Sequence, residues 1–335
     1  MIASRAKPLG MKPSPRIGIR LHGGLDPHRS VEFARAAEAN GFSSVWFAEN
    51  PMERGVMAAV AACAVATNRI ELGIGVWNPY LRHPAQIAME IGALDELSGG
   101  RASLGLGSGL AAPIRRLGID NSRPLAAMRD AFAIVRGLLA GRAVTYKGAV
   151  FSVEDARLSY TPRRPDLPLL MAARGPQALA LSGRIADGLM ISNMCPPGFA
   201  AHAAGVARPG RLVQYAPCIV SADGDAARSA IKPVLAGMLK TFWALGQKVP
   251  AAKASLVDHS GIPQADFAAA AASPETGIDW RFIDAFSIAG TPEECRTRIE
   301  TYAEAGVTDL VLTFIGADPL ADMERLARFS LARKA

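Results

Sequence analysis

Short apolar runs alternate with longer stretches in which apolar residues recur at helical spacing along most of this chain. The apolar runs predict strands at Arg16–His22, Ser44–Ala48, Ile70–Val76, Arg101–Leu106, Leu167–Ala173, Gly188–Ser192, Leu212–Val220 and Thr308–Phe314. Helices are predicted at Arg29–Asn40, Met52–Ala66, Pro84–Leu97, Arg123–Ala140, Pro176–Ile185, Ala226–Leu245 and Pro319–Arg333, with one more capped by Thr291. Eight strands, most followed by a helix, favour a closed (β/α)8 TIM barrel of the α/β class. A doubly wound open sheet is the alternative.

Three segments depart from this alternation. Val144–Val153 predicts a hairpin around Lys147 and Gly148, and the alanine-rich Gly246–Trp280 predicts an insertion without strands. Residues 1–15 are basic and proline-rich and lack the apolar core of a secretory signal, so they predict a disordered N-terminal arm. Residues 16–335 are then predicted to form a single barrel domain.

Composition narrows the classes of partner. Of the 335 residues 50% are hydrophobic and 20% are charged, which is ordinary for a globular protein. The net charge is +7, but arginines are spread along the chain without interleaved aromatics, so no nucleic-acid partner is expected. No charge-free apolar window reaches about 18 residues, so no membrane span is expected, and the protein is expected to be cytoplasmic. None of the four cysteines lies at C-x-x-C spacing, so no metal site is signalled.

Three glycines, Gly105, Gly107 and Gly109, alternate in the segment RASLGLGSGL. Counted from Gly105, a dinucleotide fingerprint needs a third glycine where Leu110 stands; counted from Gly107, its loose form fits with Ala112. It also needs a following helix, which the pattern excludes because of two interrupting residues, Pro113 and Gly118. The segment instead predicts bare backbone at the carboxyl end of the fourth strand, where a flat ligand can approach. Small residues that merely pack inside the barrel are the alternative.

The end of the third strand, GIGVWNPYLRHP, carries two glycines and then several polar side chains. Glycines inside a strand are typical of a bulge or of close backbone approach. The polar side chains are expected at the same end of the barrel, and they are Asn78, Tyr80, Arg82 and His83. A structural turn built on Asn78 and Pro79 is the alternative.

Taken together, these segments resemble the bacterial luciferase-like superfamily, and its deazaflavin branch in particular, which includes methylenetetrahydromethanopterin reductase. The matching segments are GFSSVWFAEN, IELGIGVWNPYLRHPA, LDELSGGRASLGLGSG, AARGPQALALSGRIADGLMIS and GTPEECRTRIETYAEAGVTDLVL. They lie between Arg16 and Phe314, so the resemblance covers nearly the whole chain.

The resemblance implies a barrel that binds F420, or alternatively FMN, at its carboxyl-end face. It implies a non-proline cis peptide at Gly75–Val76 behind the cofactor ring and a phosphate site at the ends of strands five and six. The implied cofactor-binding residues are Gly75, Val76, Asn78, Gly107, Ser108, Ala173, Arg174, Gly175, Pro176, Gln177 and Ser192. It also implies a homodimer packed through helices two and three, for which the small apolar surface Ala58–Ala66 is suitable.

Two departures bear on the activity. Several deazaflavin members carry Asp-His after strand two, whereas this chain has Glu49 and Asn50, and Asn50 cannot exchange a proton. Some sugar-phosphate dehydrogenases of the family carry a glutamate where this chain has Leu110, which disfavours that reaction. Glu49 is the first candidate for proton transfer and His22 the second.

The predicted activity is reduction of a small organic substrate by hydride transfer from F420. An FMNH2-dependent monooxygenase with a partner flavin reductase is the alternative, and a non-catalytic ligand-binding barrel is the second.

Overall fold

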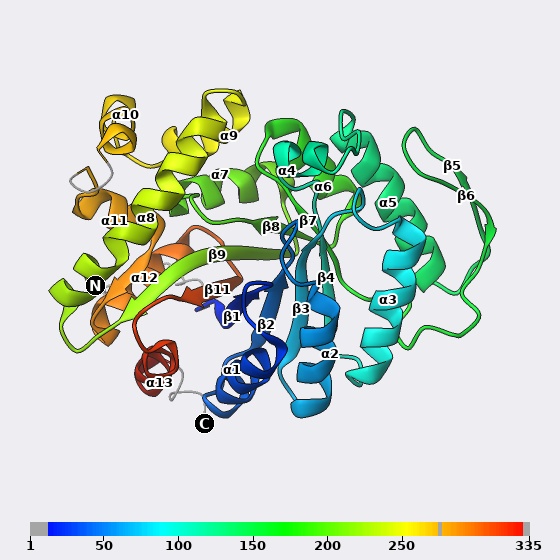
Figure 1. Ribbon diagram of the computed structural model, residues 1–335, viewed down its shortest axis with the longest axis horizontal. Helices are drawn as coiled ribbons and strands as arrows, with labels where there is room; N and C mark the ends of the chain where they lie inside the picture. The colour runs from blue at the N-terminus through cyan, green and yellow to red at the C-terminus, as the bar shows by residue number, and fades with distance from the viewer. Residues whose placement is uncertain (1–12, 274–276, 331–335) are drawn as a thin grey trace, which may run out of the picture.

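The computed structural model describes residues 13–273 and 277–330, and within them eight parallel strands close into a barrel (Figure 1). In spatial order these are β1 (Arg16–His22), β2 (Ser44–Ala48), β3 (Glu71–Trp77), β4 (Ala102–Leu106), β7 (Leu169–Ala172), β8 (Gly188–Ile191), β9 (Arg211–Val220) and β11 (Asp309–Phe314). β8 pairs with β9 and β11 pairs with β1, so the ring is complete. The predicted TIM barrel is confirmed, and the open sheet is wrong.

Helices surround the barrel (Figure 1). Those that follow barrel strands or lie between them are α1 (Pro27–Ala39), α2 (Val56–Ala66), α3 (Pro84–Leu97), α4 (Ala111–Arg116), α5 (Pro124–Leu139), α6 (Pro176–Ile185), α7 (Pro197–Ala207), α8 (Gly224–Gly246), α12 (Pro292–Glu304) and α13 (Pro319–Ser330). Most begin with a proline in the first turn, where its missing N–H leaves no helical bond unmade. The predicted start at Thr291 is a full capping box with Glu294.

The prediction that no helix follows the strand-four glycines is wrong. α4 forms directly after them, with Pro113 in its first turn and Gly118 just beyond its end. A proline near a helix start removes only an N–H that has no helical partner, and Gly118 has φ +75°, as a residue after a helix end often does.

The segment predicted as an insertion without strands is helical. It contains α9 (Pro250–Val257) and α10 (Gln264–Ala272), and α11 (Trp280–Phe286) follows it. These helices pack on α8 in a second apolar cluster that includes Leu239, Leu256, Phe267, Phe282 and Phe286. The pattern missed these helices, together with α7 and the short strand β10 (Ile288–Gly290), which extends the sheet beside β9.

The predicted hairpin is present, but it stands apart from the barrel (Figure 1). β5 (Val144–Lys147) and β6 (Ser152–Ala156) pair antiparallel in a separate sheet. The helix predicted from Met52 begins only at Val56, because Met52 takes a left-handed conformation with φ +70° in a turn.

Side chains of the barrel strands alternate between the lumen and the surrounding helices. Ile17, Ile19 and Leu21 of β1 join the main core beneath the helices, which leaves Arg20 pointing into the lumen. The middle of the lumen is apolar and is filled by Trp46, Leu170, Met190, Val213, Tyr215 and Val311. The barrel is therefore a packed core, with its two ends free to differ in chemistry.

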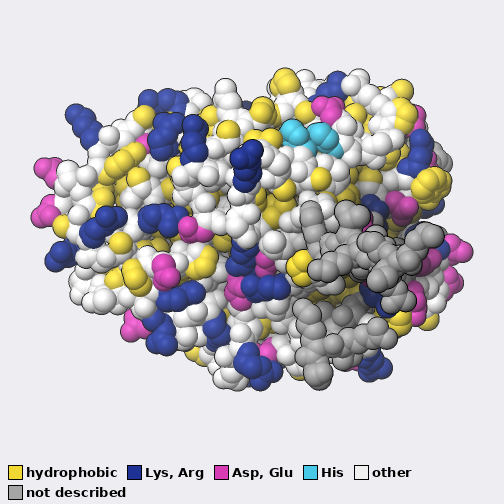
Figure 2. Space-filling view, turned by 180° about the vertical axis from the view of Figure 1, so that it is seen from behind, with side chains coloured by type: hydrophobic (Ala, Val, Ile, Leu, Met, Phe, Trp, Pro, Cys, Tyr) yellow, Lys and Arg dark blue, Asp and Glu magenta, His cyan; other side chains and the backbone are white. Residues whose placement is uncertain are grey.

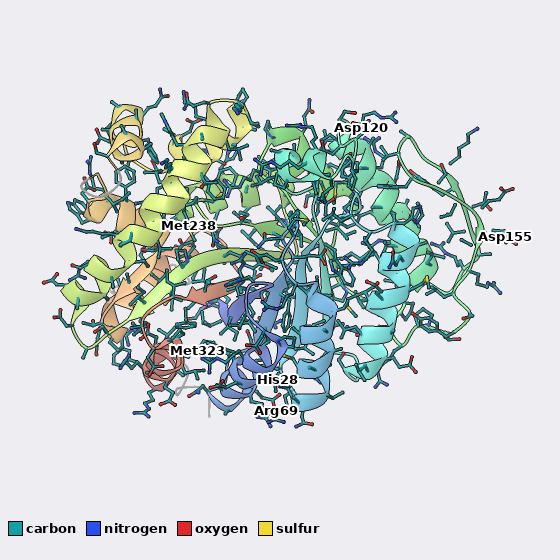
Figure 3. The ribbon with its side chains drawn as sticks, viewed as in Figure 1. His28, Arg69, Asp120, Asp155, Met238 and Met323 are labelled. Atoms are coloured by element: carbon teal, nitrogen blue, oxygen red, sulfur yellow. The ribbon has the colours of Figure 1, made fainter. Side chains whose placement is uncertain are left out.

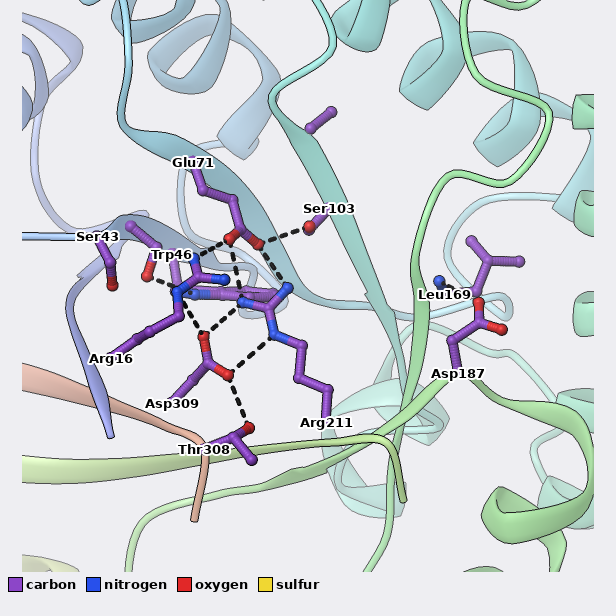
Figure 4. A network of polar contacts seen from close by, with 12 residues as sticks. Arg16, Ser43, Trp46, Glu71, Ser103, Leu169, Asp187, Arg211, Thr308 and Asp309 are labelled. Carbon is purple, nitrogen blue, oxygen red and sulfur yellow. Dashed lines mark hydrogen bonds and ion pairs between the residues drawn. The ribbon is translucent and has the colours of Figure 1, made fainter. Parts of the chain in front are cut away.

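The amino end of the barrel is closed by a network of ion pairs (Figure 4). Arg211 donates to Glu71 at 2.7 Å and to Asp309 at 2.8 Å, Arg16 pairs with Glu71, and the Ser103 hydroxyl donates to Glu71 at 2.6 Å. Burial alone would raise the pKa of Glu71, but the neighbouring Arg211, Ser103 and Arg16 outweigh it and lower that pKa. Such a network at the amino face serves stability.

The opposite, carboxyl end is where the predicted site residues fall. Arg69, just before β3, and Asp120, after α4, are labelled at opposite ends of the barrel (Figure 3).

Lysine and arginine side chains are scattered over the face seen in Figure 2. Among the described residues no helix is long and apolar enough to cross a membrane.

Part of the predicted subunit contact is exposed and apolar. Val65 of α2 is 70% exposed, and Met89 and Leu97 of α3 are 55% and 49% exposed. The homodimer stays a prediction. Most of the predicted disordered arm, residues 1–12, and the end of the last predicted helix, residues 331–333, lie outside the described residues.

Candidate active site

The site residues predicted from sequence gather at the carboxyl ends of the strands. His22 ends β1, Glu49 directly follows β2, and the Gly75–Val76 bond near the end of β3 is cis, as the resemblance implied. Parallel strands of a barrel bring these ends to one face, which is where barrel enzymes carry their active sites.

Gly107, Val76 and Ala172 form a low surface between the ends of β3, β4 and β7, here called the glycine floor. A Cβ atom on Gly107 would lie 3.0 Å from Val76 Cγ2 and 3.1 Å from Ala172 Cβ. Behind this floor the Tyr215 hydroxyl donates to the Gly75 carbonyl at 2.8 Å. Burial raises the pKa of Tyr215, so the hydroxyl keeps the proton that it donates.

Asn78 connects the two loops that edge the floor. Its Nδ2 donates to the Ser108 carbonyl at 2.9 Å, and its Oδ1 accepts from the Tyr80 N–H at 2.9 Å. Both groups of the Asn78 amide are thus used within the protein. This geometry gives Asn78 a positioning role on the loop, while the Ser108 side chain is partly exposed.

The ends of β7 and β8 offer donors to an anion. α6 begins after Gly175 without a side-chain cap, so the first N–H groups of the helix, after Pro176 at Gln177, are free to point at a ligand. The Ser192 side chain is exposed beside them, and the side chain of Ala173 is buried. These features suit a phosphate group.

Arg174 adds charge at this end of the face. Its Nη1 donates to Ser255 Oγ at 3.2 Å, its Nη2 donates to the Asn193 carbonyl, and its Cζ lies 4.6 Å from the centroid of the Phe242 ring. Among the described residues it has neutral partners and no carboxylate, so its positive charge remains available to an anion. Buried Asn193 Oδ1 has no hydrogen-bond partner there.

Glu49 is held by an ion pair that sequence reasoning did not predict. Arg82 donates to its Oε2 at 3.0 Å, also pairs with Glu90 at 2.8 Å, and lies over the Trp77 ring at 4.7 Å. The Glu49 side chain is only 10% exposed. The carboxylate is thus engaged and sheltered.

His22 is more open. Its side chain is 47% exposed, and its Nδ1 accepts from the Gly24 N–H at 3.0 Å. An imidazole that accepts at Nδ1 carries its proton at Nε2, which faces no recorded partner within the described residues. Asn50 instead donates to Glu53 at 3.0 Å, and the Glu53 carboxylate lies 3.9 Å from His22 Nδ1.

Three lumen residues near this face were missed from the sequence: Arg20, Tyr215 and Thr313. Arg20 Cζ lies 5.3 Å from the centroid of the Tyr215 ring, and its Nε is buried without a hydrogen-bond partner. Burial lowers the pKa of Arg20, although the nearby Tyr215 and Glu53 oppose that shift. The signal was present, because a charged residue stands at an inward position of the strand RIGIRLH.

A cavity of about 140 Å³ lies beside the site, between β1, β11 and the helices α1 and α13. Its walls include Leu21, Phe33 and Met323 of the core outside the lumen, and also Arg20, His22 and Thr313 at the carboxyl ends of β1 and β11. None of its lining residues belongs to the glycine floor. Among the described residues no group of three or more potential metal ligands occurs.

Comparison with known proteins agrees with this arrangement. Residues 8–309 match the family model of luciferase-like monooxygenases. The chain is 36% identical to 5,10-methylenetetrahydromethanopterin reductase of Methanolobus tindarius, over 84% of this chain and 88% of that protein. It is 30% identical to the F420-dependent glucose-6-phosphate dehydrogenase of Beutenbergia cavernae, over 92% and 93% of the two chains.

A solved structure of an F420-dependent enzyme has the same fold as this chain. The coenzyme F420-dependent tetrahydromethanopterin reductase of Methanopyrus kandleri superposes with a TM-score of 0.83 at 26% identity, and the match covers 96% of this chain and all of that one. The chain therefore belongs to the luciferase-like family of oxidoreductases.

Proposed function

We propose that this chain is an F420-dependent oxidoreductase that transfers a hydride to or from a small organic substrate held over the glycine floor, most readily as a reductase. The observation that carries the proposal is the 36% identity to a methylenetetrahydromethanopterin reductase across most of both chains. An FMNH2-dependent monooxygenase is the alternative. An FMN-bound monooxygenase shares only 15% identity with this chain, so its likeness supports the fold alone.

The residues present fit a cofactor of this kind. Val76 and Ala172 are partly exposed and close together across Gly107, so they offer a low apolar surface against which a flat ring system would lie. The uncapped start of α6, the exposed Ser192 and the charge of Arg174 would hold its phosphate. F420, when bound, supplies the hydride chemistry, and the protein supplies orientation and exclusion of water.

The two candidates for proton transfer then take different roles. His22 is open to the face and carries a proton at Nε2, so we assign it the exchange of a proton with the substrate. Glu49 is occupied by Arg82, which also contacts Trp77 at the end of β3, so Glu49 positions that loop. Leu110, 46% exposed beside the strand-four glycines, offers no group for oxidation of a sugar phosphate.

Anaerobic turnover tests this proposal. Reduced F420 should be reoxidised by substrates with reducible C=N or C=C bonds, without oxygen, and His22→Gln should slow turnover by about 100-fold with F420 affinity unchanged. Glu49→Gln should cost less, because the amide oxygen still accepts from Arg82. Turnover that requires oxygen and FMNH2 would contradict the proposal, and turnover unaffected by His22→Gln would remove that residue from its role.

We also infer that two copies pair through the exposed apolar face of α2 and α3. Sedimentation as a monomer at micromolar concentration would contradict this.

A further inference from the structure

We propose that Arg20 and Thr313 bind a carboxylate of the substrate at the level of the Gly75–Val76 bond. The inference rests on the proposed function and deepens it, because it names the chemical class of the molecule that reacts over the glycine floor. Two buried polar atoms without partners carry it, one on each of two neighbouring strands.

Arg20 differs from the other arginines that face the barrel lumen or its rim. Arg211 pairs with Glu71 and Asp309 at the amino end of the barrel, and Arg82 pairs with Glu49 at the carboxyl end. Within residues 13–273 and 277–330 the Arg20 guanidinium has neither an ion pair nor a hydrogen bond, and its one recorded contact is the Tyr215 ring. The Nε of this cation is buried without a partner, and the nearby Glu53 carboxylate makes no ion pair with it. Such an arrangement costs stability, so the place of Arg20 in the lumen calls for a ligand.

Thr313 supplies the second group. β1 and β11 are parallel and in register as far as the pair Ile19 and Leu312, so Arg20 and Thr313 are the next neighbours toward the carboxyl end. Thr313 as a whole is 8% exposed, and its buried Oγ1 has no hydrogen-bond partner. A forked guanidinium beside a hydroxyl matches the two oxygens of one carboxylate, which accept such bonds strongly.

The level of Arg20 places this carboxylate at the reacting face. Arg20 lies over the Tyr215 ring, and the Tyr215 hydroxyl donates to the Gly75 carbonyl, so one side chain separates the guanidinium from the floor. The floor is where the hydride is exchanged in the proposed function.

The order of the strands around the barrel indicates that the anion bound by Arg20 belongs to the substrate and not to the cofactor. In the order β1-β2-β3-β4-β7-β8-β9-β11, β7 lies four strands from β1 and thus across the barrel. The donors for the cofactor phosphate stand at the ends of β7 and β8. A cofactor phosphate held there puts the cofactor's anionic tail across the barrel from Arg20, which leaves Arg20 to a different anion.

Binding of matched acids and amides tests the inference. Crotonate and cinnamate are titrated by calorimetry into the F420-loaded protein, each against its uncharged amide. The wild type should bind each acid about tenfold or more tightly than its amide, and Arg20→Gln should abolish that preference with F420 affinity changed less than about twofold. Arg20→Lys should keep part of it. Arg54→Gln, which removes an exposed arginine bonded to the Gly24 carbonyl, should keep all of it.

Equal binding of acid and amide by the wild type would overturn the inference. So would a retained preference in Arg20→Gln, or a loss of F420 affinity in that variant, which would assign the arginine to the cofactor. Melting temperature separates a binding role from a structural one: Arg20→Gln should melt no lower than wild type, and a fall of several degrees would show that Arg20 serves to support Tyr215 instead.

The same titrations on protein without cofactor, read by melting temperature, separate this inference from the proposed function. If F420 does not bind but acids still stabilise the wild type more than amides and Arg20→Gln does not respond, the carboxylate site stands and the cofactor proposal fails. If F420 binds and no acid preference occurs, the carboxylate site alone fails.

Discussion

Replacing Gly107 by leucine is expected to weaken F420 binding by at least about 100-fold while the barrel still folds. Gly107 stands between Val76 and Ala172 on the proposed floor, and even a Cβ there lies in tight contact with both. Val76 and Ala172 leave no space for a longer side chain between them. The leucine side chain must therefore extend over the glycine floor, where the cofactor ring would lie. The cost to folding should stay near the roughly 1–3 kcal/mol of an overpacked site.

Fluorescence titration with F420 measures this effect. Gly205→Leu is the matched control, because Gly205 lies exposed on α7 with no atom within 4 Å of a built Cβ. That variant should bind F420 as the wild type does. If Gly107→Leu also binds F420 normally and melts like the wild type, the glycine floor is not the cofactor's surface.

Glu71→Gln is expected to lower the free energy of unfolding by about 3–5 kcal/mol, as measured by urea denaturation. Glu71 is the acceptor for Arg211, Arg16 and Ser103 at the closed amino end, and its side chain is only 16% exposed. The amide keeps the shape but removes one of two carboxylates, so Arg211 and Arg16 are left to share Asp309. Glu324→Gln, which breaks an exposed pair with Arg328, should change stability by less than about 0.5 kcal/mol.

The effect should depend on pH in a defined direction. The folded-state pKa of Glu71 is lowered below its ordinary value of 4.5, so its charged form stabilises the protein above that value. This contribution is lost as the pH falls below 4.5 through the folded-state pKa. The gap in stability between wild type and Glu71→Gln should therefore be constant near neutral pH and narrow in acid. A gap that widens in acid would contradict the charge network.

Strong local signals made the barrel predictable. The strands β1 and β2 and the helices α3 and α6 occupy the predicted residues. Short apolar runs and prolines at helix starts are local signals, which neighbouring residues of the sequence carry. α4 was excluded wrongly because a proline was taken as an interruption when it stands in a first turn. The helices after α8 were missed because their alanine-rich sequence has no clear polar face.

The site was predictable in position and less so in chemistry. The strand-end rule and the family motifs placed Gly75, Gly107 and Arg174 at one face. The engagement of Glu49 by Arg82 joins residues 33 positions apart, which no local pattern encodes. The isolation of Arg20 is likewise a property of the closed barrel, because it depends on which side chains every other strand sends inward.

Paired equilibrium titrations of the purified protein with F420 and with FMN test the central claim most directly. The account predicts that F420 binds at micromolar concentration or below and that FMN binds much more weakly. Tight FMN binding with weak F420 binding would contradict it and favour an oxygen-dependent flavin monooxygenase. Binding of neither cofactor would instead favour a ligand-binding barrel without catalysis.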